Sequence, residues 1–193
     1  AREGVAHARA AGDSAVLPYV LGTRGVALQH LGRDAEAAEC YQAASRRLAA
    51  RGLRVLAGAY RLNLGDLEFA RGRLERAERL LEGALPALDD GWPTIAGVAR
   101  GTLARLRAGQ GDLEEARRLW ERAAEQVGDD DPLQVVRLQL KGALIEAEHG
   151  ALEVAVERLA AAEERLPRLG PKIDAETRGL LQAARTAIGQ RPD

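Results

Sequence analysis

Three histidines and one run of aspartates are the residues best suited to hold a metal ion. His7, His30 and His149 fall in different parts of the chain, without a second ligand at the spacing that a zinc site uses. The aspartates 129–131 are consecutive, whereas a calcium loop spaces its oxygen ligands along the loop. We interpret these aspartates as helix-capping residues that the helix dipole favours, and we predict no metal and no other cofactor.

The sequence shows no motif for a catalytic nucleophile either. Cys40 is the one cysteine, and we expect it to pack as a small apolar side chain. Ser14 and Ser45 lack the sequence context of a catalytic serine, and the chain has no Gly-x4-Gly-Lys-Ser/Thr phosphate loop. A single cysteine also excludes an intrachain disulfide and is typical of a reducing compartment. We therefore expect a cytoplasmic protein that is not an enzyme.

The composition predicts an all-α protein. The 28 basic and 29 acidic residues give a net charge of −1, which provides no field to recruit nucleic acid or an anionic membrane. No apolar run approaches the roughly 18–20 residues of a transmembrane helix. Aromatic residues make up only 3% of the chain, so the core must be built from leucine, alanine and valine. These apolar residues recur at spacings of three and four, which indicates amphipathic helices.

A glycine followed by a fixed set of small and large residues recurs along the chain. In the first copy, Ala37, Tyr41 and Ala44 follow Gly32. The same positions are held by Gly72, Ala77, Leu81 and Ala84, by Gly111, Ala116, Trp120 and Ala123, and by Gly150, Ala155, Leu159 and Ala162. The four glycines are 40, 39 and 39 residues apart. This internal repeat predicts stacked helix pairs that share one continuous core.

A second series of turn residues divides each repeat into two helices, called A before the first glycine series and B after it. This series consists of Gly12, Gly52, Gly91, Asp130 and Gly170. We predict helices at 14–31, 34–50, 53–71, 73–88, 93–110, 112–127, 131–149, 151–166 and 171–188, with Pro86 and Pro167 near the ends of two of them. Residues 1–11 then form the end of an earlier B helix. The repeats span about 14–51, 53–90, 93–129 and 131–169 within a single domain of residues 1–193, which we expect to be a piece of a longer array.

These residues resemble the tetratricopeptide repeat. The alanines and large residues named above match its B helices, and small residues stand seven before each turn glycine, at Gly25, Gly65, Ala104 and Ala143. The resemblance covers the whole chain and implies a right-handed superhelical solenoid of antiparallel helix pairs, with about four and a half repeats. The period of 39–40 residues exceeds the usual 34 and is similar to that of arrays in MalT-like and other LuxR-type bacterial signalling regulators.

The resemblance also implies that the A helices line a concave groove that binds protein. The groove residues would be Tyr19, Val26, Gln29, His30, Leu62, Asn63, Asp66, Phe69, Val98, Thr102, Arg105, Arg137, Leu140 and Leu144, together with Gly22, Gly101 and Lys141. This mixture of apolar and polar groups suits a peptide or a helix, and the two glycines would admit a ligand backbone. The alternative is that some of them, Leu62, Phe69 and Leu144 above all, only seal neighbouring helices.

Chaperone-binding members of the family clamp a terminal carboxylate with five polar residues. The corresponding positions here are Gly22, Val26, Asn63, Val98 and Thr102, and only Asn63 matches. We therefore expect no binding of a chaperone tail.

We expect a protein–protein interaction scaffold that binds a protein, a peptide or another domain of its parent chain, and neither nucleic acid nor membrane. Self-association through exposed apolar faces stays open. The alternative function is a ligand-sensing, regulatory domain of a bacterial signal-responsive transcription regulator.

Overall fold

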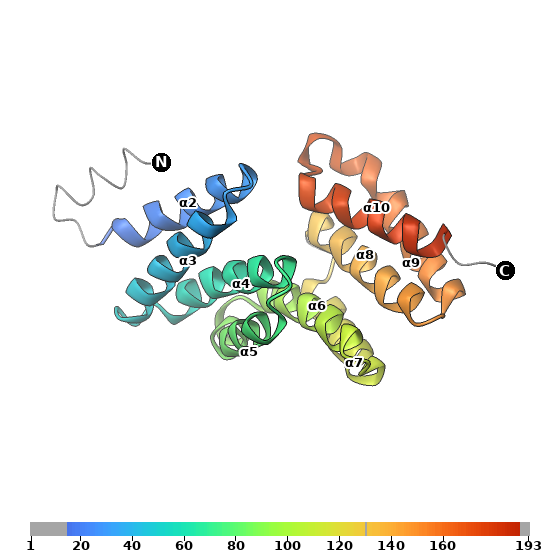
Figure 1. The fold of residues 1–193 in the computed structure, drawn as a ribbon, viewed down its shortest axis with the longest axis horizontal. Coiled ribbons are helices and arrows are strands. Elements are labelled where there is room, and N and C mark those ends of the chain that lie inside the picture. Colours follow the sequence, from blue (N-terminus) through green and yellow to red (C-terminus); the bar gives the residue numbers. More distant parts are fainter. Residues whose placement is uncertain (1–14, 130, 190–193) are drawn as a thin grey trace. The chain divides into compact units, whose positions relative to one another are not determined.

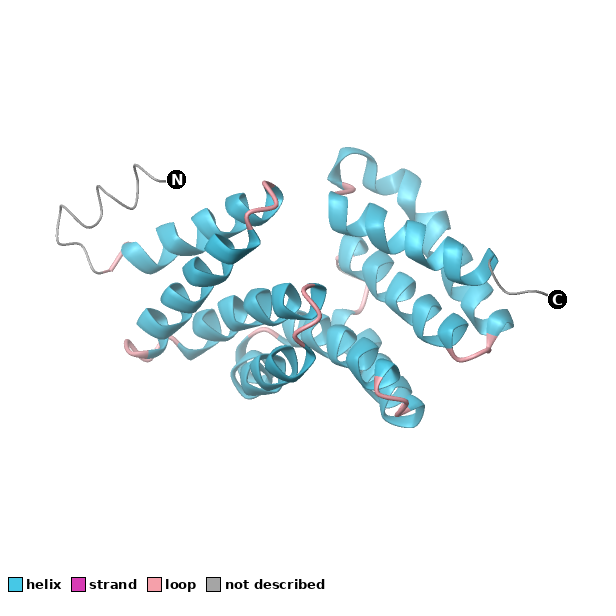
Figure 2. Ribbon diagram, viewed as in Figure 1, coloured by secondary structure: helices cyan, strands magenta, loops and turns pink. Residues whose placement is uncertain are grey.

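All regular elements of the computed structural model are helical within the residues that it describes, 15–129 and 131–189 (Figure 1, Figure 2). The α-helices are α2 (Leu17–His30), α3 (Asp34–Ala49), α4 (Arg54–Ala70), α5 (Leu74–Gly91), α6 (Pro93–Gly109), α7 (Leu113–Val127), α8 (Pro132–Glu148), α9 (Leu152–Leu169) and α10 (Ala175–Gly189), and the 3-10 turn η1 (Gly170–Lys172) precedes α10. The predicted all-α class is confirmed. The helix end expected at 1–11 and the turn at Gly12 lie outside the described residues.

The observed helix bounds follow the predicted ones closely, and the differences lie at proline and glycine. Pro86 and Pro167 are inside α5 and α9 rather than at their ends. Each proline removes one helical hydrogen bond, but both are exposed, so the carbonyl left without its donor does not have to be buried. Gly91 is the last residue of α5 and has no positive φ, whereas Gly128, after α7, adopts a positive φ of 57°. Asp130, the predicted turn residue, lies outside the described residues.

The turn glycines end their helices in one shared conformation. At Gly72, φ is 70°, and the N–H of Arg73 donates to the carbonyl of Glu68 at 2.9 Å while that of Gly72 donates to Phe69 at 2.9 Å. This pair of bonds is the Schellman motif, which satisfies the last carbonyls of a helix. The same pair of bonds closes the turns at Gly32, Gly52, Gly111 and Gly150. The glycine spacing in the sequence therefore records a repeated backbone geometry.

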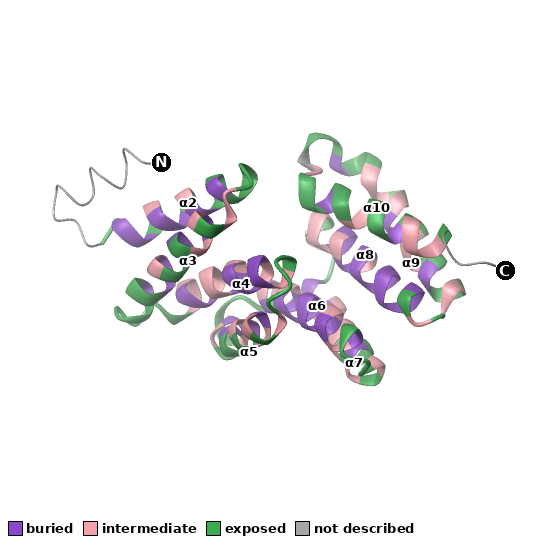
Figure 3. Ribbon diagram, in the orientation of Figure 1, coloured by how far each residue is buried: buried purple, intermediate pink, exposed green. Residues whose placement is uncertain are grey.

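The chain divides into two compact units, Ala1–Trp92 and Pro93–Asp193. In the first unit, α3 packs against α2 and α4, and α4 packs against α5. In the second unit, α7 packs against α6 and α8, and α8 also contacts α9 and α10. Buried residues gather where the helices of a unit face each other (Figure 3).

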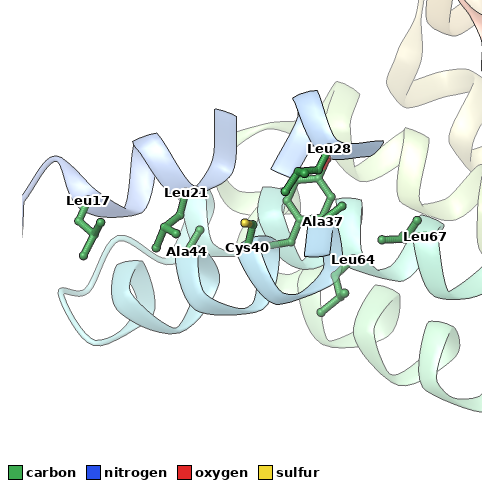
Figure 4. Close-up of a cluster of buried hydrophobic side chains, with 9 residues drawn as sticks. Leu17, Leu21, Leu28, Ala37, Cys40, Ala44, Leu64 and Leu67 are labelled. Atoms are coloured by element: carbon green, nitrogen blue, oxygen red, sulfur yellow. The ribbon is translucent and has the colours of Figure 1, made fainter. Parts of the chain in front are cut away.

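Small residues on the A helices make room for large residues on the B helices. In the first unit, a side chain on Gly25 would place its Cβ 2.6 Å from the ring of Tyr41, and one on Gly65 would lie 2.8 Å from Leu81. Tyr41 belongs to the cluster of buried side chains that α2, α3 and α4 form together (Figure 4). In the second unit, Ala104 and Ala116 share a cluster, and Ala143 and Ala162 share another. The predicted close crossing of A and B helices is thus present in both units.

No described helix is both long and apolar enough to cross a lipid bilayer.

Gly111→Ala should destabilise the protein by about 1–2 kcal/mol, because an alanine at a φ of 87° is strained. Gly109→Ala is the matched control, since a Cβ at either glycine meets no atom within 4 Å and Gly109 lies in α6 without a positive φ. That variant should gain about 0.4–1 kcal/mol from the lower entropy of the unfolded chain. Urea unfolding followed by circular dichroism measures both, and equal effects of the two variants would contradict the turn assignment.

Candidate functional site

The predicted groove residues of the first unit lie on α2 and α4 with very different exposure. Tyr19 and Val26 on α2 are each 41% exposed, and Gln29 and His30 are exposed as well. Gln29 accepts a hydrogen bond from the Tyr41 hydroxyl at 2.8 Å. On α4, the side chains of Asn63, Asp66 and Phe69 are half-buried.

Gly22 serves packing rather than the approach of a ligand backbone. A Cβ on Gly22 would lie 2.1 Å from the ring of Tyr60, so this ring already occupies the space. Tyr60 also stacks on Tyr41, with ring centroids 6.3 Å apart. The expectation that Gly22 admits a ligand is therefore wrong.

Four predicted groove residues have almost no accessible surface. Leu62 is 4% exposed, Thr102 2%, Leu140 0% and Leu144 3%. Leu140 and Leu144 belong to the hydrophobic cluster of α8, α9 and α10. Leu62 and Leu144 therefore pack between neighbouring helices, as the alternative interpretation predicted, and do not line an open groove. The same holds for Leu140, because α8 is covered by helices on several sides and has almost no free apolar face.

Four other predicted residues of the second unit do come together, around one hollow. It is a shallow, open concavity that encloses only about 10 Å³. Its lining is Val98 and Gly101 from α6, Val127 from α7, and Gln134, Arg137, Leu138 and Lys141 from α8. Val98, Gly101, Arg137 and Lys141 were predicted from the A-helix register. A ligand pocket for a small molecule usually measures about 300–1,000 Å³, so the hollow is far too small to enclose a metabolite.

Two cations line the hollow, and their surroundings differ. Arg137 forms ion pairs with Asp174 and with Glu176, the latter at 3.1 Å, and its Nε donates to the Thr177 hydroxyl at 3.1 Å. Lys141 is 8% exposed, and its Nζ donates to Thr102 Oγ1 at 2.9 Å. The positive charge of Arg137 is therefore balanced by α10, whereas Lys141 contacts a neutral hydroxyl.

Arg105, the remaining predicted residue of α6, makes an ion pair with Glu148 at 3.2 Å. Burial lowers the pKa of its guanidinium, which Glu148 opposes. Arg105 therefore joins α6 to α8.

A buried ion-pair network lies among α7, α8 and α9. Glu146 is 3% exposed and accepts hydrogen bonds from Arg117 at 3.1 and 2.6 Å, with Arg158 Nη2 at 3.8 Å. The Arg158 guanidinium lies 3.6 Å from the ring centroid of Trp120, which is a cation–π contact. Trp120 Nε1 donates to the carbonyl of Leu138 at 2.9 Å, so this network positions a residue that lines the hollow.

Sequence reasoning missed this network, although a signal was present. Glu68 and Glu146 both stand four residues before a turn glycine and between apolar neighbours, Leu67 and Phe69 in one case and Ile145 and Ala147 in the other. Glu68 is 0% exposed and forms ion pairs with Arg73, which directly precedes α5, and with Arg76 of α5. A carboxylate at a position that packing would bury indicates a buried ion pair, since such a charge needs a partner.

The arrangement offers hydrogen-bond donors on an apolar wall and no reactive constellation. Among the residues that the structure describes, no three His, Cys, Asp or Glu side chains gather as a metal site would need. Cys40 is buried, and burial raises the pKa of its thiol, against the lowering effect of Arg24. His149 Nδ1 lies 2.8 Å from the carbonyl of Ile145, a contact within its own helix end. His7 lies outside the described residues.

Comparisons with known proteins support the repeat type and the fold. Residues 58–86, which run from α4 into α5, match the family model of the tetratricopeptide repeat. The crystal structure of BtubC (BKLC) from P. vanneervenii is similar, with a TM-score of 0.66, 19% sequence identity, and coverage of 84% of this chain and 68% of that chain. No curated protein sequence matches the chain. The chain therefore contains a repeat of tetratricopeptide type and has an all-α helical-repeat fold.

Asp174→Asn should destabilise the second unit by about 0.5–1.5 kcal/mol near neutral pH, because it removes a charged partner of Arg137. Burial alone would raise the pKa of Asp174, but the N–H and hydroxyl of Thr177 together with Arg137 hold it below its ordinary value of 3.8. The ionised form is thus favoured by folding. Its stabilisation is present above the unfolded pKa and is lost as the pH falls through the lower folded pKa.

Urea unfolding over a pH series measures this effect. The difference between wild type and Asp174→Asn should narrow as the pH drops through that range, and the exposed Glu164→Gln on α9 should show no comparable loss near neutral pH. A difference that stays constant down to acid pH would contradict the role of the Asp174 charge.

Proposed function

We propose that this chain is a non-catalytic protein–protein interaction scaffold whose A helices bind a peptide, a helix or a partner domain. Tetratricopeptide repeats generally mediate protein–protein interactions, and all-helical repeat folds of this type are typically non-catalytic. The match at 58–86 and the helical-repeat fold support this proposal.

The observation that carries the proposal is the hollow of the second unit. It lies between α6 and α8, on the A helices that the register singled out, and combines the apolar Val98 and Leu138 with the polar Gln134 and Lys141. Such a mixture is what a binding surface for a peptide or helix needs, since apolar contacts supply affinity and polar groups fix the register. In this proposal the hollow is part of the surface that contacts the partner.

The first unit adds exposed apolar side chains on its own A helix. Tyr19 and Val26 are seven residues apart on α2 and are both 41% exposed, so they lie on one face of the helix. His30, a further turn along, is exposed as well. Tyrosine with its amphipathic ring is enriched at protein interfaces, so this face is a second contact surface in the proposal.

The alternative function is a ligand-sensing domain of a bacterial signal-responsive transcription regulator. The repeat period near 40 residues favours it. The hollow, which encloses only about 10 Å³, weighs against it, since a metabolite pocket usually exceeds about 300 Å³. We therefore place the scaffold first.

Val98→Glu should abolish capture of the partner, because the added carboxylate would fill the hollow and pair with Lys141. The control is Val156→Glu, the same substitution at a valine of α9 that is 49% exposed and does not line the hollow. Affinity capture from a lysate of the source organism, read by mass spectrometry, compares both variants with wild type. A substitution at Leu140 is unsuitable, since this side chain is fully buried.

A protein that is retained by Val156→Glu and lost with Val98→Glu would support the proposal. Circular dichroism must show equal helicity in both variants. If a folded Val98→Glu variant captures the same proteins as wild type, the hollow is not the binding site.

A further inference from the structure

Two segments that hold the same place in the repeat carry opposite charge. Residues 44–57, the cationic turn, join α3 to α4 and contain four arginines and no acidic residue. Residues 123–136, the anionic turn, join α7 to α8 and contain four acidic residues and no basic one. The segments are 79 residues apart, as are the turn glycines Gly32 and Gly111. A chain with 28 basic and 29 acidic residues thus separates its charges at two equivalent turns.

The cationic turn has no ionic partner within the described residues. Its arginines are all exposed, namely Arg46, Arg47, Arg51 and Arg54. Arg51 Nη1 donates to the carbonyl of Ala15 at 3.0 Å, which is a neutral acceptor. Asp89 and Asp90, at the end of α5, form no ion pair with these arginines either. By contrast, Arg118 on the exposed face of α7 pairs with Glu114 and Glu115 of its own helix.

The anionic turn is likewise unneutralised. Glu125 and Asp129 are exposed, and among the described residues no arginine or lysine forms an ion pair with them. Asp131 caps α8, since its Oδ1 accepts hydrogen bonds from two backbone N–H groups at 3.2 Å. Asp130 lies outside the described residues. The acidic charge of this turn therefore faces solvent.

Helix dipoles do not account for the sign of each turn. They favour Arg46 and Arg47 at the end of α3 and Asp131 at the start of α8. They disfavour Arg54, which is the first residue of α4, and Glu125, which lies in the last turn of α7. Each turn thus keeps one sign on both of its helices. A surface for an oppositely charged partner needs this arrangement.

We propose that the cationic turn of one copy of this chain binds the anionic turn of a second copy. The guanidinium groups of the arginines donate to the carboxylates of Glu125 and Asp129, a pairing that the planar fork of arginine suits. This inference goes beyond the proposed function and does not involve the hollow.

The chain itself supplies the complementary surface, which favours a second copy as the occupant. Its net charge is only −1, so two copies approach each other without strong overall repulsion. Exposed ion pairs are individually weak, so the contact depends on several pairs acting together. It must also weaken as salt screens the charges.

The experiment is sedimentation velocity of the full chain over a concentration series up to about 0.5 mM, at about 20 mM and about 500 mM NaCl. We expect reversible association at low salt and an apparent Kd about tenfold or more weaker at high salt, because the Debye length shortens. A wild type that stays monomeric at low salt, or association that salt does not weaken, would overturn the inference.

Two complementary variants test which surfaces meet. Arg46→Glu with Arg47→Glu neutralises the cationic turn and keeps the anionic one, whereas Glu125→Lys with Asp129→Lys does the reverse. Each variant alone should be monomeric under conditions in which wild type associates. An equimolar mixture should form a one-to-one complex, because each variant retains the turn that the other has lost. A mixture that stays monomeric, or variants that associate alone as wild type does, would contradict the pairing.

Arg71→Glu with Arg79→Glu is the matched control. It changes the net charge by the same amount at two exposed arginines of the first unit that lie outside the cationic turn. This control should associate as wild type does, and an equal loss would assign the effect to net charge and overturn the inference. Circular dichroism verifies the folding of each variant, and the variant at Glu125 and Asp129 still tests the pairing should the one at Arg46 and Arg47 fail to fold. These outcomes leave the scaffold proposal untouched, since its own test is Val98→Glu.

Discussion

The absence of a side chain at a few A-helix positions determines how the helices of this protein pack. Tyr41 and Leu81 occupy the space where Gly25 and Gly65 carry no Cβ, and alanines take the same part in the second unit. Because the large side chain of the B helix lies against a small residue of the A helix, the two helices can pack closely. Interiors packed at crystal-like density leave little tolerance for a change of volume at such contacts. The spacing of small and large residues in the sequence is thus a direct record of the crossing geometry.

Much of the fold could be predicted from the sequence because this crossing and the turn are local. Gly72 and Gly111 marked Schellman turns, and helix bounds followed from them. Pro86 and Pro167 were harder to place, since a proline disfavours a helix interior and yet both lie inside their helices, α5 and α9. Asp130 was predicted as a turn residue and lies outside the described residues, whereas Gly128, two residues earlier, adopts a positive φ.

The candidate site was less predictable, because it depends on neighbouring repeats. Val98, Gly101, Arg137 and Lys141, which the A-helix register assigned to the groove, line one hollow. The register could not show that Leu140 and Leu144 are buried, because the side chains that bury them belong to α9 and α10 rather than to α8. Nor could it show that Tyr60 fills the space over Gly22. A repeat pattern determines which residues share a face of a helix. The solvent exposure of those residues depends on the side chains that pack against them from other helices.

The two buried glutamates have a consequence for how far these helix pairs can be exchanged as modules. Glu68 pairs with Arg73, just before α5, and with Arg76 on α5, the second helix of its own pair. Glu146 relies on Arg158 of its own pair but also on Arg117 of the preceding one. If α4 and α5 were duplicated or transplanted together with the turn between them, Glu68 would keep both of its arginine partners. If α8 and α9 were moved in the same way, Glu146 would keep Arg158 but lose Arg117. The repeats share the same turns and so look interchangeable. The ion pair between Glu146 and Arg117 nevertheless makes α8 and α9 depend on α7.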